Sequence, residues 1–415
     1  MVTEQLTQAR AALASAGMRI RWRSPIRGPW LTSVFGLVLL CALPVVIVTG
    51  LLDWVAYGSG AIPADVGALH LPRFDWPTRP AWLFRLTQGL HVGLGIVLVP
   101  VVLAKLWSVI PKLFTKPDRN LLKLAERGTL VLLVGGILFE IVTGLLNIQY
   151  DYVFGFSFYA AHYAGAWVFI AGFVLHVALK LPTMVRSLRS RSLRTELRTP
   201  LAATVPEPPD EGGLVAPDPD PPTMSRRGAL ALVGGGVALL AGLTVGQTLD
   251  GPLRGTALLL PRGRTAPGDF PVNRTFVASG ISPDAVGAGW SLDLGAVRLT
   301  RDELAALPQH TADLPIACVE GWSTQQTWSG VRLRDLAALA GVPEPAGATV
   351  RSVEEGPFAR APLTAGQVLD PDSLLALRVN GSDLTPDHGY PARVIVPALP
   401  GVHCTKWVAA IGFSR

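Results

Sequence analysis

The stretch LPIACVEGWSTQQTWSGVRLRDLAALAGV, residues 314–342, places Cys318 at the end of an apolar run and a short helical pattern at 331–340 behind it. Short runs broken by Gly or Pro lie on both sides of it: TFVASGI (275–281), WSLDLG (290–295), LLALRVNG (374–381) and ARVIVPAL (392–399). Runs of this kind between turn-forming residues are typical of strands. We therefore expect residues 265–415 to form an α+β domain with mixed sheets.

Residues 314–342 resemble the cysteine segment of the sulfite oxidase fold, and specifically its molybdenum-dependent methionine sulfoxide reductase branch. Two later segments agree in order: LLALRVNGSDLTPDHGYPARVIVP (374–397) and PGVHCTKWVAAIGF (400–413). The resemblance implies a molybdopterin-dependent oxidoreductase, in which a pterin dithiolene and the thiolate of Cys318 hold molybdenum; soft sulfur ligands suit such a site. The alternative for Cys318 is a buried small hydrophobic residue. Cys404 is either a second ligand or a packing residue.

The same resemblance assigns polar residues to the cofactor. Arg393, His403 and Lys406 would meet the phosphate tail of the pterin through charge-assisted hydrogen bonds. Asn273 and Thr275 would contact the pterin near the start of the domain, or else be solvated surface residues. The residues expected to border the metal as catalytic groups are Glu320, Trp322 and Tyr390. The side chain of Glu320 either shuttles protons or shapes its own loop.

The loop after Cys318 departs from sulfite oxidases proper, which place a basic residue there to bind the anion. Here the order is Val319, Glu320, Gly321 and Trp322, with an acidic side chain in place of a basic one. The loop does not suit sulfite, and the resemblance to the methionine sulfoxide reductase branch, together with Glu320, implies reduction of an S-oxide or N-oxide, either a small molecule or an oxidised protein.

Five apolar segments precede residue 250, at 31–52, 83–107, 128–146, 161–181 and 228–248. A bilayer is crossed by about 20 helical residues, so each is long enough to span one. The mean hydropathy of +0.39 and the 16% share of charged residues agree with a membrane protein. We expect an all-α transmembrane four-helix bundle, followed by a fifth anchoring helix.

Basic residues flank these segments on alternate sides, and Lys and Arg favour the cytoplasmic side of a membrane. They precede the first segment and follow the second and the fourth: Arg19, Arg21, Arg23, Arg27, Lys112, Lys116, Arg119, Lys123, Arg127, Lys180, Arg186, Arg189, Arg191, Arg194 and Arg198. The other two loops carry Asp53, Asp65, Asp75 and Asp151, with only Arg73 and Arg79 as basic residues. We therefore expect a multi-pass protein of the cytoplasmic (inner) membrane, with its N-terminus in the cytoplasm and its C-terminal domain outside.

The sequence SRRGALALVGGGVALLAGLTVG, residues 225–246, resembles a twin-arginine export signal, with Arg226 and Arg227 before a Gly-rich apolar run. The alternative is an ordinary fifth span. A Pro-rich and acidic stretch at 199–223 precedes it and predicts a flexible linker. The expected organisation is a cytoplasmic N-terminus (1–27), a cytochrome b-like membrane domain (28–182), a cytoplasmic linker (183–224), a signal-anchor helix (225–250) and an extracytoplasmic molybdopterin-binding domain (251–415).

Three of the seven histidines fall in the first four apolar segments: His91, His162 and His176. His162 and His176 are 14 residues apart, hence about 40° apart around a helix and about 21 Å apart along it. His91 is about level with His162. Two imidazoles that face each other across a bundle can hold a b-type haem, and His91 and His162 are the expected pair. The alternative for a membrane histidine is a hydrogen bond between helices.

The segments LTQGLHVGLGIVLVP (86–100) and HYAGAWVFIAGFVLHVALK (162–180) resemble the four-helix cytochrome b subunits of bacterial formate dehydrogenases and hydrogenases, over residues 28–182. That family carries a further histidine on its first helix, which completes a second, inner haem. The first segment here has none. His176 therefore binds a second haem through another partner, contacts protons or quinone, or is a relic.

The combined expectation is an enzyme that passes electrons from membrane quinol through haem b to molybdenum. The alternatives are a molybdenum dehydrogenase that delivers electrons to quinone, a membrane cytochrome with a non-catalytic exported domain, and a haem-free sensor or scaffold. The net charge of +6 follows the membrane flanks, and no basic stripe interleaved with aromatic residues predicts nucleic-acid binding. The expected partners are quinone or quinol, the substrate and the twin-arginine export machinery.

Overall fold

The computed structural model describes residues 23–58, 65–66, 69–70, 74–114, 121–147, 158–210, 213–259, 269–356 and 359–415. Some of the charges used to predict the orientation of the chain lie outside the described residues: Arg19, Arg21, Arg73, Lys116, Arg119 and Asp151.

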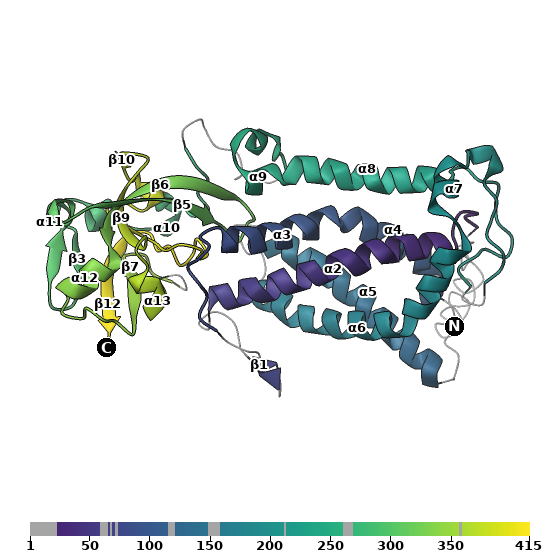
Figure 1. Ribbon diagram of the computed structural model, residues 1–415, viewed down its shortest axis with the longest axis horizontal. Helices are drawn as coiled ribbons and strands as arrows, with labels where there is room; N and C mark the ends of the chain where they lie inside the picture. The colour runs from purple at the N-terminus through teal and green to yellow at the C-terminus, as the bar shows by residue number, and fades with distance from the viewer. Residues whose placement is uncertain are drawn as a thin grey trace, which may run out of the picture. The chain divides into compact units, whose positions relative to one another are not determined.

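Long helices form most of the first 250 residues (Figure 1). They are α2 (Pro29–Tyr57), α3 (Leu83–Val97), α4 (Val99–Phe114), α5 (Leu121–Asn147), α6 (Phe158–Ser190) and α8 (Arg226–Thr244). Four helical stretches of the described residues are long and apolar enough to cross a membrane, or five if the bent pair α3 and α4 is one span. The five predicted segments are therefore helical. Shorter elements are the two-residue strands β1 (Asp65–Val66) and β2 (Leu69–His70), α7 (Leu193–Arg198), η1 (Leu201–Ala203), α9 (Gly246–Leu249) and η2 (Gly251–Thr256).

The second predicted span is not one straight helix. It bends by 42° between α3 and α4, at Leu98. Pro100 follows directly, and it has no N–H to donate to the carbonyl of Ile96. The bend is the physical result of that missing hydrogen bond.

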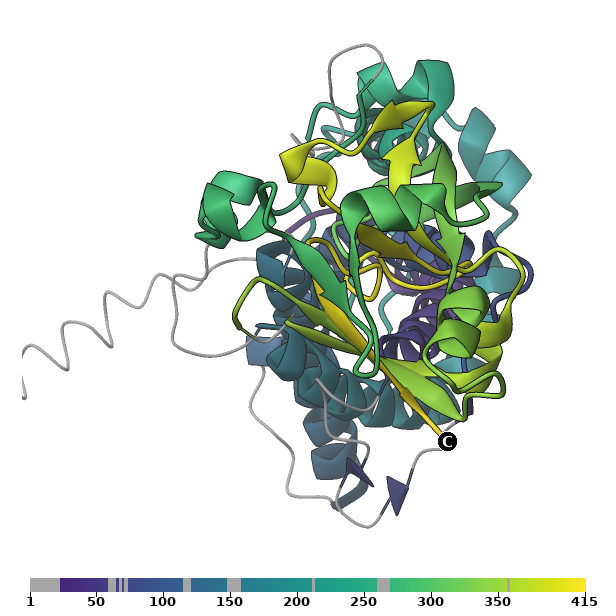
Figure 2. The same ribbon diagram turned by 90° about the vertical axis from the view of Figure 1, so that its left-hand side faces the viewer.

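Two five-stranded sheets build the C-terminal region (Figures 1 and 2). One has the order β10-β9-β6-β5, with β11 also paired to β9; its strands are β5 (His310–Ala317), β6 (Ser323–Arg332), β9 (Leu374–Val379), β10 (Ser382–Asp383) and β11 (Arg393–Ile395). The other has the order β4-β3-β12-β7-β8; its strands are β3 (Ser291–Asp293), β4 (Arg298–Thr300), β7 (Gly347–Ser352), β8 (Arg360–Thr364) and β12 (Val408–Ser414). The only parallel pair of strands in the described part of these sheets is β3 with β12, so the prediction of an α+β domain with mixed sheets is confirmed.

Short helices connect these strands: α10 (Phe276–Ser279), η4 (Pro283–Val286), α11 (Arg301–Ala306), α12 (Leu333–Leu339), α13 (Ala365–Leu369) and η5 (Pro386–His388). The helix predicted at 331–340 is confirmed as α12. The strand predicted at 275–281 is wrong, because these residues form α10. The hydroxyl of Thr275 accepts a hydrogen bond from the N–H of Ala278, and Gly280 ends the helix with a φ of 72°. These two local caps outweigh the β-forming tendency of Phe276 and Val277.

The chain divides into two compact units. One contains residues 1–38, 101–128 and 177–234, and the other contains residues 39–100, 129–176 and 235–415. The second unit therefore holds both sheets, the segments of α3 and α6 that carry His91 and His162, and parts of α2 and α5.

Within the first unit, the predicted linker packs against its neighbours rather than remaining free. The carboxylate of Glu207 is buried and accepts a hydrogen bond from the N–H of Trp30 at 3.3 Å. Arg226 is 1% exposed; its guanidinium lies 3.5 Å from Glu196 and donates to the carbonyl of Val205. A buried arginine needs charged partners, so the stretch predicted to be a flexible linker contributes buried residues to this unit.

Candidate functional site

Cys318 is the first residue of the turn that joins β5 to β6. These strands pair antiparallel up to Ala317 and Ser323. The N–H of Cys318 donates to the carbonyl of Trp322, and the N–H of Gly321 donates to the carbonyl of Cys318, both at 2.9 Å. The φ of Gly321 is 88°, which a glycine adopts without strain. The thiol of Cys318 is thereby held at the end of a strand, 5% exposed.

Side chains from the helices bind the backbone of this turn. The hydrogen bonds run from Gln88 Nε2 to the carbonyl of Val319 at 2.8 Å, from Gln247 Nε2 to that of Glu320 at 3.1 Å, and from Thr248 Oγ1 to that of Gly321 at 2.7 Å. The sequence analysis did not identify these residues. A signal was present, because a glutamine within or beside an apolar span needs a polar partner.

The side chains of Glu320 and Trp322 contact each other within the turn. The indole N–H of Trp322 donates to Oε2 of Glu320 at 2.9 Å, and both residues are buried. The carboxylate is therefore held in the turn that presents Cys318, and no basic side chain follows the cysteine there.

Arg393 lies on β11 and is buried beside the two cysteines. Its Nε donates to the carbonyl of Cys404 at 3.1 Å and its Nη1 to that of His388 at 3.3 Å. Burial lowers the pKa of Arg393 to about 10, while Cys404 and Cys318 act in the opposite direction. Burial also raises the pKa of the Cys404 thiol, whose Sγ lies 4.0 Å from the carbonyl of Val396. Cys404 thus has the surroundings of a packing residue.

Lys406 is a second cation in this region. Its Nζ donates to the carbonyls of Arg274 and Asp387, with 3.0 Å to the latter. Burial, and to a smaller extent the charge of Arg393, lowers the pKa of Lys406 to about 7. The hydroxyl of Thr405 is buried and has no hydrogen-bond partner within the described part of the chain. A buried cation, a half-buried cation and an unsatisfied hydroxyl suit an anionic group such as the phosphate tail of a pterin.

His388 and His403 lie near these cations. His388 stacks on Phe270, with ring centroids 3.6 Å apart, and its Nε2 lies 2.8 Å from Asp269 Oδ1. His403, predicted to meet the phosphate, has its Nε2 2.8 Å from the carbonyl of Tyr57 at the end of α2. Burial lowers the pKa of both histidines, which favours the neutral imidazole. The sequence analysis did not identify His388.

The remaining predicted residues lie at the margin of the site. Asn273 is half-buried, whereas Thr275 is exposed and caps α10. Tyr390 packs against the apolar cluster that contains Cys318, and the guanidinium of Arg301 lies 5.1 Å from the centroid of its ring. The structure thus gathers Cys318, Trp322, Cys404 and Tyr390 in one cluster.

His91 and His162 face each other in the helical segments. Their ring centroids are 6.0 Å apart and their planes are nearly perpendicular, at 84°. Nδ1 of His91 lies 2.9 Å from the carbonyl of Val46, and Nδ1 of His162 lies 3.1 Å from Glu140 Oε2 and 3.0 Å from Thr143 Oγ1. A histidine that binds iron through Nε2 is commonly oriented in this way through Nδ1. His176 is half-buried further along α6.

Unsatisfied polar atoms occur on α2 and α6, the helices that carry Val46 and His162. Trp54 Nε1, Tyr163 Oη and Trp167 Nε1 are buried without a hydrogen-bond partner among the described residues. Glycines lie against both rings: a Cβ at Gly50 would lie 2.6 Å from His91 Cε1, and one at Gly144 would lie 3.3 Å from His162 Cε1. Such a setting fits a large planar ligand that carries acidic groups.

Among the residues that the structure describes, no group of three or more His, Cys, Asp or Glu side chains could hold a metal ion. A metal at either site therefore needs further ligands from an organic cofactor, as a pterin dithiolene or a porphyrin provides.

Comparison with known proteins agrees with this chemistry. Residues 283–415 match the family described as the oxidoreductase molybdopterin binding domain. The uncharacterized oxidoreductase YuiH of Bacillus subtilis (strain 168) is 39% identical over 118 residues, which are 28% of this chain and 59% of YuiH. Sulfite oxidase of Arabidopsis thaliana is 34% identical over 111 residues, 22% of this chain and 28% of that protein. Residues 283–415 thus match the model of a molybdopterin-binding oxidoreductase domain, and their sequence is similar to that of sulfite oxidase.

Two further proteins are similar to part of this chain. Nitrate reductase [NADH] of Volvox carteri is 33% identical over 144 residues, 27% of this chain and 17% of that protein. The solved sulfane dehydrogenase SoxCD of Paracoccus pantotrophus has a TM-score of 0.28 and 25% identity, covering 31% of this chain and 38% of that one. The chain spans less than two thirds of the length of each of these relatives.

Proposed function

We propose that this protein is a membrane-anchored molybdopterin oxidoreductase that takes electrons from quinol, passes them through a haem b held by His91 and His162, and reduces an S-oxide or N-oxide outside the cytoplasm. With a sulfoxide the reaction balances as quinol plus sulfoxide giving quinone, sulfide and water. A pterin-bound molybdenum supplies two-electron oxygen-atom transfer, and a haem supplies one-electron transfer.

One observation carries the proposal. The turn that presents Cys318 is hydrogen-bonded at Val319 to Gln88, and His91 lies three residues further along the same helix. Residues three apart on a helix lie on the same side, about 5–6 Å between their Cβ atoms. The expected molybdenum ligand and the expected haem ligand are therefore joined by a short, packed path within one compact unit.

The protein groups have separate tasks in this scheme. The thiolate of Cys318 binds the metal, while Arg393 and Lys406 neutralise the phosphate tail. Trp322 packs beside the metal ligand and excludes water from it. The carboxylate of Glu320 disfavours anionic substrates and carries a proton towards the oxygen that leaves as water.

The test uses detergent-purified protein, with molybdenum and iron measured together, and a Cys318→Ser variant. We expect molybdenum near one per chain in the wild type, much less in the variant, and the same iron in both. Methionine sulfoxide should then reoxidise the reduced haem of the wild type but not of the variant. Reduction of the oxidised haem by sulfite at a comparable rate would reverse the direction of the scheme, and iron without molybdenum in the wild type would overturn it.

A further inference from the structure

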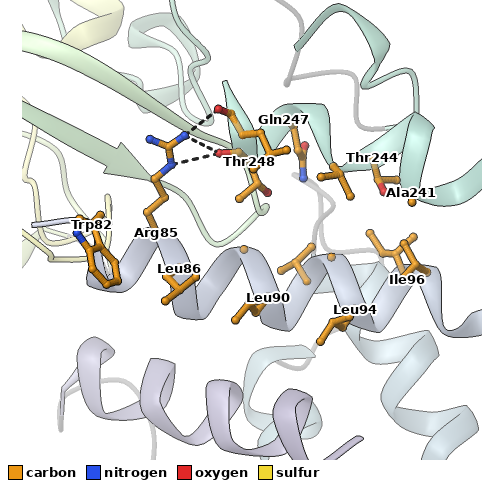
Figure 3. A pocket seen from close by; sticks show the side chains of 16 residues that line it. Trp82, Arg85, Leu86, Leu90, Leu94, Ile96, Ala241, Thr244, Gln247 and Thr248 are labelled. Carbon is orange, nitrogen blue, oxygen red and sulfur yellow. Dashed lines mark hydrogen bonds between the residues drawn. The ribbon is translucent and has the colours of Figure 1, made fainter. Parts of the chain in front are cut away.

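An apolar pocket of about 440 Å³ lies between α3 and the end of α8 with α9 (Figure 3). All of its walls belong to the second compact unit. Leucine and valine side chains make most of the surface, including Leu86, Leu90, Leu94 and Val97 on α3 and Val245 opposite them. Leu86 and Leu90 are 45% and 37% exposed, so the mouth of the pocket is apolar as well.

One polar atom inside the pocket lacks a partner. Gln247 is 2% exposed. Its Nε2 donates a hydrogen bond to the carbonyl of Glu320, and its Oε1 has no hydrogen-bond partner among the described residues. A buried amide oxygen without a donor is energetically unfavourable. The guanidinium of Arg85, at the same end, is engaged with the carbonyls of Thr248 and Leu249. The pocket therefore suits an apolar molecule that brings one hydroxyl donor to Gln247.

The pocket lies next to both proposed redox sites. Its α3 face includes Gly89 and Gly93, and His91 projects about 160° away from each of them at 100° per residue. The turn of Cys318 borders the pocket, because a Cβ at Gly321 would lie 2.7 Å from Val92 Cγ1 and 2.8 Å from Gln247 Nε2. A redox-active occupant would sit one helix away from the histidine pair and beside the molybdenum turn.

We propose that this pocket binds the ring of an isoprenoid quinol, with one hydroxyl donating to Gln247 Oε1 and the tail leaving between Leu86 and Leu90. This inference rests on the proposed function and names the place where the electron donor enters. A phospholipid chain would fill the apolar walls but would leave Gln247 Oε1 without a donor. A lipid phosphate would need a cation, and Arg85 already donates to two carbonyls.

Two neighbouring glycines give a matched pair of variants. A Cβ at Gly93 or Gly95 would meet nothing within 4 Å, so both accept a larger side chain, yet only Gly93 lines the pocket. Gly93→Leu should fill the cavity, whereas Gly95→Leu should not. A third variant, Gln247→Leu, removes the acceptor.

The experiment labels the purified holoprotein, under anaerobic conditions, with a photoreactive azido-quinol, whose hydroxyls are the donors that the proposal requires, and locates the label by mass spectrometry. We expect label on peptides from residues 82–97 and 241–249, competed by a short-chain quinol but not by phospholipid. Gly93→Leu and Gln247→Leu should lose at least nine tenths of it, and Gly95→Leu should keep it. Label elsewhere, equal label in Gly93→Leu and Gly95→Leu, or displacement by phospholipid alone would overturn the assignment.

Haem absorbance and molybdenum content, measured on the same samples, separate this inference from the proposed function. Protein that contains both cofactors and whose haem is reduced by quinol, but which is labelled at another place, contradicts only the pocket. Protein that binds azido-quinol in the pocket but contains no haem contradicts the proposed electron path, whereas the inference about the binding site would still hold.

Discussion

The side-chain amide of Gln88 donates a hydrogen bond to the backbone carbonyl of Val319, with 2.8 Å between Nε2 and the oxygen. Gln88 is 4% exposed and belongs to an apolar helix, whereas Val319 follows the expected molybdenum ligand. A buried hydrogen bond between a helix and a turn fixes the distance between them. The coupling of the two proposed redox sites should therefore depend on this residue.

Gln88→Leu should loosen the turn without removing either cofactor. It leaves the carbonyl of Val319 unsatisfied, at a cost of about 1–3 kcal/mol. We expect reoxidation of the haem by methionine sulfoxide to slow by about tenfold, the equivalent of about 1.4 kcal/mol in barrier, as measured by stopped-flow absorbance. The matched control is Gln325→Leu, since Gln325 is exposed in β6. Equal rates in both variants would show that this hydrogen bond does not position the path.

Lys406 should make the stability of cofactor-free protein depend on pH. Burial lowers its pKa to about 7 in the folded chain, whereas lysine in an unfolded chain titrates near 10.4. Between these values the unfolded state holds a proton that the folded state has lost, so the free energy of unfolding should rise with pH. Urea titrations from pH 7 to 10 should show this rise, and Lys406→Met should lack it.

The cofactor should remove the same pH dependence. A bound phosphate stabilises the charged form of Lys406, which restores the pKa towards its ordinary value. Protein with a full complement of molybdenum should therefore show a flatter curve than cofactor-free protein, and Lys406→Met should contain less than half of the molybdenum of Lys406→Arg. Equal molybdenum in these two variants would contradict a phosphate-binding role.

Local patterns in the sequence were enough to predict the five apolar helices and the α+β class of the C-terminal region, because hydropathy and short β-like runs report local structure. They failed at residues 275–281, where the cap formed by Thr275 and Gly280 decides for a helix. They also missed the bend at Leu98, although Pro100 was present in the sequence.

Contacts over long sequence separations explain what the sequence analysis did not find in the site. Gln88 and Gln247 lie 231 and 73 residues from the carbonyls that they bind. No periodicity links residues so far apart. Cys318, Arg393 and Lys406 were identified only because three segments of the sequence, in the same order, resemble a known family. No pattern in the sequence indicated His388, whose ring stacks on that of Phe270.

If His91 and His162 bind the haem, substitutions of the three membrane histidines should differ in their effect on haem content. His91→Ala and His162→Ala should each remove the Soret band and most of the iron, because each loses one axial ligand, while molybdenum content remains. His176→Ala should keep the haem of the pair. Iron and absorbance spectra of the purified variants provide the measurement, and loss of all haem in His176→Ala would place the iron elsewhere.

The charge of Glu320 should determine whether the site accepts neutral or anionic substrates. Its carboxylate is buried and held by Trp322 in the turn of Cys318, so an anion approaching the metal is repelled by a nearby negative charge. Glu320→Gln keeps the size of the side chain and an acceptor for the indole N–H, but removes that charge.

We expect kcat/KM of Glu320→Gln for methionine sulfoxide to fall about tenfold through loss of the proton carrier, with activity towards anions such as sulfite or nitrate rising. Assays of both substrates from pH 5 to 9 separate the two effects: a sulfoxide rate that no longer varies with pH supports proton transfer by Glu320. An unchanged pH profile together with an unchanged preference for neutral substrates would leave Glu320 with no role beyond shaping the turn.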